Sequence, residues 1–159
     1  MFYNIMKDNE IGRARSKDVA PAELSVSTGF LLAWTAAASA REYADALRSV
    51  GLTPVQAGVL ELLQGSPQKQ ARLSEQLRVF QPVMVSVINA LENQSLAERR
   101  PHPTDRRAVE VHLLPAGRER LELAQRLGRE ATNSFFSPIS QAERTTLHSI
   151  LTRLAGREQ

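Results

Sequence analysis

The sequence contains no cysteine among its 159 residues. This absence excludes disulfide bonds, thiolate-ligated metal sites and the sensing of oxidants through a thiol. Histidine is also scarce: the chain has His102, His112 and His148, and no two of them have the HxH or HxxxH spacing of a metal site. A zinc ion would need histidines and carboxylates from distant parts of the chain. We expect ordinary histidines, no metal and no other cofactor.

Long apolar runs are missing as well. The longest, Gly29–Ala40, has about a dozen residues, whereas a helix needs about 20 to cross a bilayer. Lys7 and Glu10 interrupt the N-terminus before any apolar stretch that could form a signal peptide. We therefore expect a soluble protein of the cytoplasm, without a membrane partner. The chain also lacks a nucleophile elbow, a P-loop and a GxGxxG motif, so we expect no enzyme.

Positive charge is concentrated in one place. The formal net charge is only +3, but residues 99–107 hold four arginines against a single aspartate. This basic stretch joins two runs that are typical of strands, Leu96–Arg100 and Val109–Leu113. The pattern predicts a two-stranded ribbon with an arginine-rich tip. Because guanidinium groups match phosphates and base edges, the ribbon suits an anionic groove.

The rest of the chain shows helical periodicity. Thr53-Pro54-Val55-Gln56 and Ser140-Gln141-Ala142-Glu143 are capping boxes, which mark helix starts. The apolar spacing predicts six helices, over about residues 24–50, 54–64, 70–78, 82–93, 115–136 and 141–154. We expect a mostly α fold with a small β-ribbon wing. The predicted organisation is a loose N-terminal arm (1–20), a dimerisation helix (21–50), a DNA-binding lobe (51–115) and C-terminal dimerisation helices (116–159).

Three helices followed by a basic ribbon form a winged helix-turn-helix, which usually binds duplex DNA. On the predicted recognition helix, the candidate base contacts are Val83, Ser86 and Asn89, since asparagine can read adenine and valine can touch a thymine methyl. The alternative is that Asn89 is simply exposed. Arg99 and Arg100 should face opposite ways on one strand, so we expect one of them to contact phosphate, and Arg100 is the candidate. Arg72, near the start of the short helix, is a further candidate for a backbone contact.

The helices outside the predicted DNA-binding lobe have apolar stripes of their own. They could pack on their own domain or pair with the same helices of a second copy. We favour a homodimer, because a pseudo-palindromic operator presents two half-sites and three additional amphipathic helices are hard to bury otherwise.

Residues 53–117 resemble the MarR family of bacterial transcriptional regulators, through LTPVQAGVLELL, LSEQL, VINALENQSLAERR and above all the wing segment DRRAVEVHLLPAGRE. The segment PISQAERTTLHSILTRL resembles the closing dimerisation helix of that family. The resemblance implies a homodimer, wings in the minor groove and a site for small phenolic or aromatic effectors that release the DNA. It implies that Asp105 orients the wing and that Arg107 enters the minor groove. Arg106, in the same arginine-rich tip, and His102, near Asp105, are further candidate wing contacts from their position in the sequence.

Two features of the sequence allow more than one interpretation: the composition of the recognition helix and the aromatic residues of the first predicted helix. The family often has arginine where this chain has Ser86 and Ala90, and glycine where it has Ser95. A recognition helix with few cations is also compatible with a winged-helix module that binds another protein. Trp34 and Tyr43 are candidates for an effector pocket, although their helical spacing fits plain core residues equally well.

Overall fold

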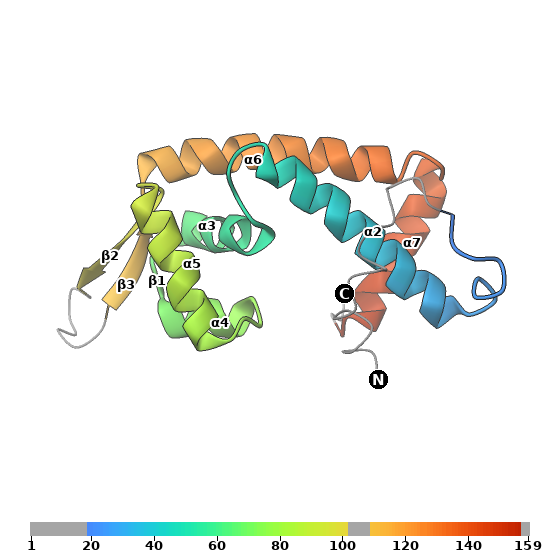
Figure 1. Ribbon diagram of the computed structural model, residues 1–159, viewed down its shortest axis with the longest axis horizontal. Coiled ribbons are helices and arrows are strands. Elements are labelled where there is room, and N and C mark those ends of the chain that lie inside the picture. Colours follow the sequence, from blue (N-terminus) through green and yellow to red (C-terminus); the bar gives the residue numbers. More distant parts are fainter. Residues whose placement is uncertain (1–18, 102–108, 157–159) are drawn as a thin grey trace. The chain divides into compact units, whose positions relative to one another are not determined.

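The computed structural model describes residues 19–101 and 109–156. Six helices and three short strands lie in these ranges (Figure 1). They are α2 (Thr28–Arg48), α3 (Pro54–Gly65), β1 (Gln68–Lys69), α4 (Gln70–Gln76), α5 (Gln81–Asn93), β2 (Ala97–Pro101), β3 (Val109–Leu113), α6 (Pro115–Phe135) and α7 (Gln141–Leu154). The predicted mostly α class with a small ribbon is confirmed. None of the described helices is long and apolar enough to cross a membrane.

The chain divides into two compact units, of which one comprises Tyr43–Gly128 and the other comprises residues 1–42 and 129–159. We call these the central unit and the terminal unit. Helices α2 and α6 contribute residues to both. The dimerisation role expected for residues 21–50 and 116–159 stays a prediction.

The central unit contains every fully buried apolar side chain of the described residues. They are Leu47, Leu52, Ala57, Val59, Leu60, Leu63, Leu73, Met84, Ile88, Leu91, Leu96, Ala97, Val111, Leu121 and Ala124. Helices α3, α5 and α6 each present one apolar face to this core, as their sequence periodicity predicted. This core gives the recognition region a rigid support.

The predicted capping box at the start of α3 is confirmed. The Thr53 hydroxyl accepts from the Gln56 amide at 3.2 Å, and the Gln56 side chain accepts from the Thr53 amide at 2.8 Å. A second capping box marks the start of α7. The Ser140 hydroxyl accepts from the Glu143 amide at 3.3 Å, and the Glu143 carboxylate accepts from the Ser140 amide at 2.8 Å. Both boxes satisfy backbone donors that a helix start otherwise leaves without partners.

The sheet is antiparallel, with strand order β1-β3-β2. In the β2–β3 pair Arg99 lies opposite Val111 and Arg100 opposite Glu110. Strand β1 was not predicted, because its two residues, Gln68 and Lys69, gain their extended form from pairing with Val111 and Glu110.

A tight turn joins α5 to β2, and it places Ser95 in the left-handed region at φ 55°. The Ser95 amide donates to Glu92 O at 2.8 Å and the Leu96 amide to Leu91 O at 2.9 Å. A residue with a Cβ pays about 1–2 kcal/mol for this conformation. That strain explains why a glycine suits this position better than the serine found here.

Candidate nucleic-acid interface

Helices α4 and α5 form the helix-turn-helix of the central unit. Residues 77–80 connect the two helices, and Arg78 takes a left-handed φ of 52° in this turn. The Ser74 hydroxyl donates to the carbonyl of Val79, which fixes the turn from the inside. Because Leu73 on α4 and Met84 and Ile88 on α5 are all buried, the two helices are held firmly together.

The outward side of α5 carries the three predicted base contacts. Val83, Ser86 and Asn89 are all exposed, and their spacing of three residues puts them in one oblique row. The Ser86 hydroxyl donates to Pro82 O at 3.3 Å within the helix. The Asn89 side chain accepts a hydrogen bond at 2.8 Å from Arg99 of β2.

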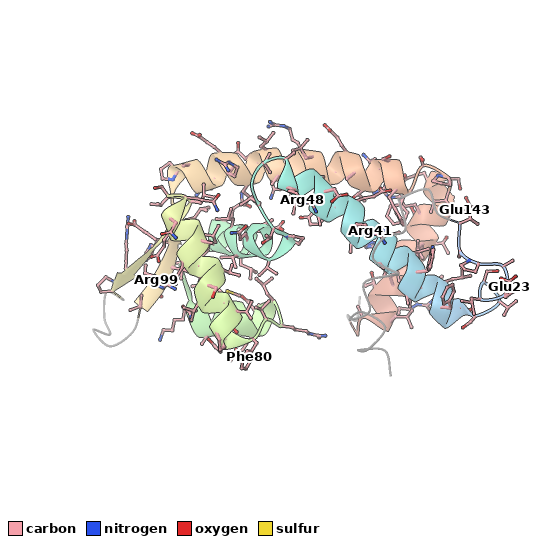
Figure 2. The ribbon with its side chains drawn as sticks, in the orientation of Figure 1. Glu23, Arg41, Arg48, Phe80, Arg99 and Glu143 are labelled. Carbon is pink, nitrogen blue, oxygen red and sulfur yellow. The ribbon has the colours of Figure 1, made fainter. Side chains whose placement is uncertain are left out.

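Phe80 is a candidate functional residue that the sequence analysis missed. It precedes Gln81 and Pro82 as the N-cap of α5, and 74% of its surface is exposed. Figure 2 places Phe80 at the end of the α4–α5 pair that bears the turn. Phe80 lies between two predicted helices, over residues 70–78 and 82–93, and the sequence carries no signal that a phenyl ring there is exposed. Together with the half-exposed Val83, it forms an apolar start to the recognition helix.

Positive charge around α5 comes from other elements. The helix itself contains no lysine or arginine, and its single charged residue is Glu92. Arg72 on α4 and Arg100 on β2 are exposed, as contacts to phosphates require. Arg100 pairs with Glu98 of its own strand, with 2.6 Å between Nε and Oε1. An exposed pair of this kind contributes little to stability and can exchange partners readily.

Arg99 faces the helices, whereas Arg100 faces away from them. Figure 2 shows Arg99 between β2 and α5. The same face of the sheet carries the buried residues Ala97 and Val111. The sequence did predict that the two arginines face opposite ways. Alternation with the apolar Ala97 was the signal that could have assigned Arg99 to the inner side.

The remaining wing candidates, His102, Asp105, Arg106 and Arg107, lie outside the described residues. The described base of the wing consists of β2 and β3.

On β3, His112 is half-buried with its Nε2 3.9 Å from the Glu110 carboxylate. The described residues contain no cluster of side chains that could hold a metal ion.

The two effector-pocket candidates lie nine residues apart on α2. Trp34 is half-buried, with its ring 5.6 Å from that of Phe30. Tyr43 packs against Gly128, and burial raises the pKa of its phenol above the usual value, with a further increase from the carboxylate of Glu61. Nine residues correspond to about two and a half helical turns, so Trp34 and Tyr43 lie on roughly opposite sides of α2.

The terminal unit does contain a cavity, of about 810 Å³. Residues of α2, the end of α6, the segment 136–139 and α7 line it, among them Leu32, Phe135, Phe136, Leu147 and Leu151. Neither Trp34 nor Tyr43 belongs to the lining within the described part of the chain. The lining is predominantly apolar, and Leu32 and Leu151 remain substantially exposed.

A helix-turn-helix that packs on a buried core and is followed by two antiparallel strands defines a winged-helix protein. A sequence model described as the MarR family matches residues 50–108. A relative from Thauera aromatica, named for a transcriptional regulatory role at the hcr operon, is 32% identical over 128 residues, which cover 79% of this chain and 77% of the relative. The chain therefore belongs to the MarR family of transcriptional regulators.

Solved structures agree with this assignment. A protein from Pseudomonas aeruginosa assigned as a transcriptional regulator has a TM-score of 0.73 and 31% identity, with 82% of this chain and 98% of that chain covered. The transcriptional repressor CouR bound to a 23-mer DNA duplex has a TM-score of 0.77 and 28% identity, covering 87% and 99%. CouR from Rhodococcus jostii RHA1 bound to p-coumaroyl-CoA shares the fold at a TM-score of 0.73 and 22% identity, covering 87% and 99%.

Proposed function

We propose that this chain is a homodimeric, sequence-specific DNA-binding repressor that acts in the cytoplasm. The observation that carries the proposal is the row of exposed side chains on α5, held by a buried core beside the wing. Val83, Ser86 and Asn89 face the bases of the major groove, and Arg72 and Arg100 contact the phosphate backbone. The likeness to CouR, a repressor solved on a DNA duplex, supports the same mode of binding.

The wing supplies the remaining contacts in this proposal. Arg106 and Arg107 lie in the minor groove, where guanidinium groups respond to groove width and potential. Asp105 orients the wing and His102 contacts the backbone. Because α5 has no cationic residue of its own, the binding free energy depends strongly on these arginines.

The terminal unit is the dimerisation surface. It has no fully buried apolar residue within 19–42 and 129–156, since all of those lie in the central unit. Instead it exposes a set of large apolar side chains: Leu24, Val26, Leu31, Leu32, Ile150, Leu151 and Leu154. Such a surface is unfavourable in water, and a second copy related by a two-fold axis would cover it. A dimer of this kind has two α5 helices, one for each half-site of a pseudo-palindromic operator.

The test measures, by fluorescence anisotropy, how tightly the full-length protein binds the DNA upstream of its own coding region. We expect affinity at least about 1,000-fold above that for unrelated duplex. If about 6–10 phosphates are contacted, affinity should fall by about 10³–10⁵ between 50 and 200 mM salt. Equal, weak binding to both duplexes would contradict the proposal for that DNA. Failure with a randomised duplex library as well would favour a protein-binding module.

The apolar start of α5 leads to a further prediction about thymine. Phe80 and Val83 are 74% and 50% exposed, so they can contact C5-methyl groups in the major groove. Replacing the contacted dT by dU removes one methyl, which should weaken binding about fourfold. Variants Phe80→Ala and Val83→Ala should bind more weakly and lose this dependence. The control is dU placed outside the bound sequence, which should have no effect; a methyl dependence that survives in both variants would refute these contacts.

We further propose that a small aromatic ligand releases the repressor from DNA. The support is the bound p-coumaroyl-CoA in CouR, a protein of the same fold. Trp34 is the single tryptophan of the chain and lies on α2, whose residues Leu32 and Thr35 line the cavity, so its fluorescence can serve as a nearby reporter of a ligand bound there. Aromatic acids and their CoA thioesters that quench this fluorescence should also lower DNA affinity in the anisotropy assay. Quenching without any loss of DNA affinity would contradict release.

A further inference from the structure

Arg99 of β2 connects the wing to the recognition helix through a hydrogen-bond network. One of its terminal nitrogens donates to the Asn89 Oδ1 at 2.8 Å and also pairs with the Glu92 carboxylate. The other donates to the Gln70 side chain of α4 at 3.3 Å. The Arg99 backbone amide donates to the second oxygen of Glu92 at 2.8 Å. The guanidinium of this β2 residue is therefore bound to side chains of two helices, α4 and α5.

This network determines which end of the Asn89 carboxamide faces the protein. A guanidinium carries only donors, so the atom that meets it must be the acceptor Oδ1. The two polar atoms of the carboxamide lie on one planar carbon, and so the NH₂ group is turned away from Arg99. Within the described part of the chain this NH₂ has no partner, and the side chain is exposed. Asn89 therefore presents donors to whatever lies against α5.

Glu92 holds the Arg99 guanidinium in place against the Asn89 oxygen. Its carboxylate accepts from the Arg99 backbone and from the guanidinium, and both side chains are about one quarter to one third exposed. A charge-assisted pair in this partly buried setting is stronger and better defined than a surface pair. The Arg100–Glu98 pair on the other face, at 57% and 38% exposure, is the surface counterpart.

We propose that Arg99 is a positioning residue that sets the base preference of Asn89. Arg99 takes one lone pair of Oδ1 and places a positive charge beside it, which makes the oxygen a poorer acceptor for a base, so Asn89 reads a base mainly through its NH₂ group. The matching edge is that of guanine, with O6 and N7, or of thymine, with O4. The bidentate contact to adenine that asparagine usually makes would need the second lone pair of Oδ1 to accept from N6, and the adjacent guanidinium charge disfavours that bond. This inference rests on the proposed DNA-binding function, and it refines the adenine contact expected from the sequence.

The experiment is selection of binding sites from a randomised duplex library by the full-length protein and its variants. For the wild type we expect guanine or thymine, preferred about 5- to 150-fold, at one position in each half-site. Asn89→Ala should lose this preference at that position alone. Arg99→Gln frees the carboxamide to turn and should shift the same position towards adenine or towards no preference. The double variant should behave like Asn89→Ala.

Arg100→Gln is the matched control, because it removes the same charge from the next residue of the same strand. It should lower affinity for all duplexes uniformly and leave the preferred bases unchanged. Melting temperatures establish that each variant is folded. If Arg99→Gln is unstable, Arg99→Lys retains the charge beside Glu92 but lacks the planar fork, and it should weaken the preference at the same position.

Two outcomes would overturn the inference. One is adenine at the position that depends on Asn89 in the wild type. The other is an unchanged preference at that position in both Arg99→Gln and Arg99→Lys. If the wild type enriches no sequence at all, the proposed DNA-binding function fails and this inference fails with it. The presence or absence of an enriched wild-type sequence therefore distinguishes the two failures.

Discussion

Replacing Gly117 with alanine should destabilise the central unit by about 3 kcal/mol or more. Gly117 is buried in the first turn of α6, and a Cβ there would lie 2.0 Å from the Leu96 carbonyl oxygen and 2.9 Å from Leu113 Cδ1. The same carbonyl accepts from the Leu114 amide at 3.1 Å, so the backbone cannot move away without losing that bond. Thermal unfolding followed by circular dichroism should show a melting temperature lower by roughly 6–12 °C.

Gly65→Ala is the matched control for this prediction. Gly65 is the last residue of α3, and a Cβ there would meet no atom within 4 Å. Since alanine is the better helix former, this variant should be unchanged or more stable by about 0.4–1 kcal/mol. Equal melting temperatures for Gly117→Ala and the wild type would mean that α6 does not pack against the start of β2 as described.

Replacing Leu151 with glutamate should convert the protein to monomers and abolish tight operator binding. Leu151 lies on α7 and is 38% exposed, and it belongs to the apolar set that a second copy would cover. A carboxylate at that position would lose its hydration on dimerisation without gaining a partner. Light scattering should report a mass near the 17.6 kDa of one chain. Operator affinity should fall by about 10²–10⁴, because one protein no longer engages two half-sites.

The control introduces the same charge on the other side of the same helix. Thr145 is exposed, and its hydroxyl donates to Gln141 O within α7 at 2.9 Å. Its position along the helix puts it roughly opposite Leu147. Thr145→Glu should therefore remain dimeric and bind DNA as the wild type does. A monomeric wild type, or a dimeric Leu151→Glu, would show that the exposed apolar set of the terminal unit is not the dimer contact.

The helices were predictable because their signals are local. Thr53 with Gln56 and Ser140 with Glu143 form capping boxes within four residues of sequence, and the structure contains both. Strand β1 could not be predicted, since it has only two residues. They are extended because they pair with β3. Long-range pairing of this kind leaves no periodic trace in so short a segment.

The candidate site likewise has one part that local sequence patterns predict and another that depends on long-range contacts. Exposure of Asn89 followed from helical periodicity, which also put Met84, Ile88 and Leu91 in the core. The bond between Asn89 and Arg99 depends on how β2 lies against α5, and no pattern within either segment encodes that contact. The wing tip, where the sequence signal for DNA binding was strongest, lies outside the described residues, and its roles stay predictions.

The lack of lysine and arginine in α5 has a consequence for how the protein searches a genome. Attraction to arbitrary DNA is electrostatic and scales with the number of cations near the phosphates, so a recognition helix without cations adds little to it. The base contacts that we propose for Val83, Ser86 and Asn89 would contribute binding free energy only at matching base pairs. A genome offers about 10⁶–10⁹ competing sites, and weak retention on them leaves more of a small protein pool available for the operator. Occupancy in the cell would then be set by discrimination rather than by raw affinity.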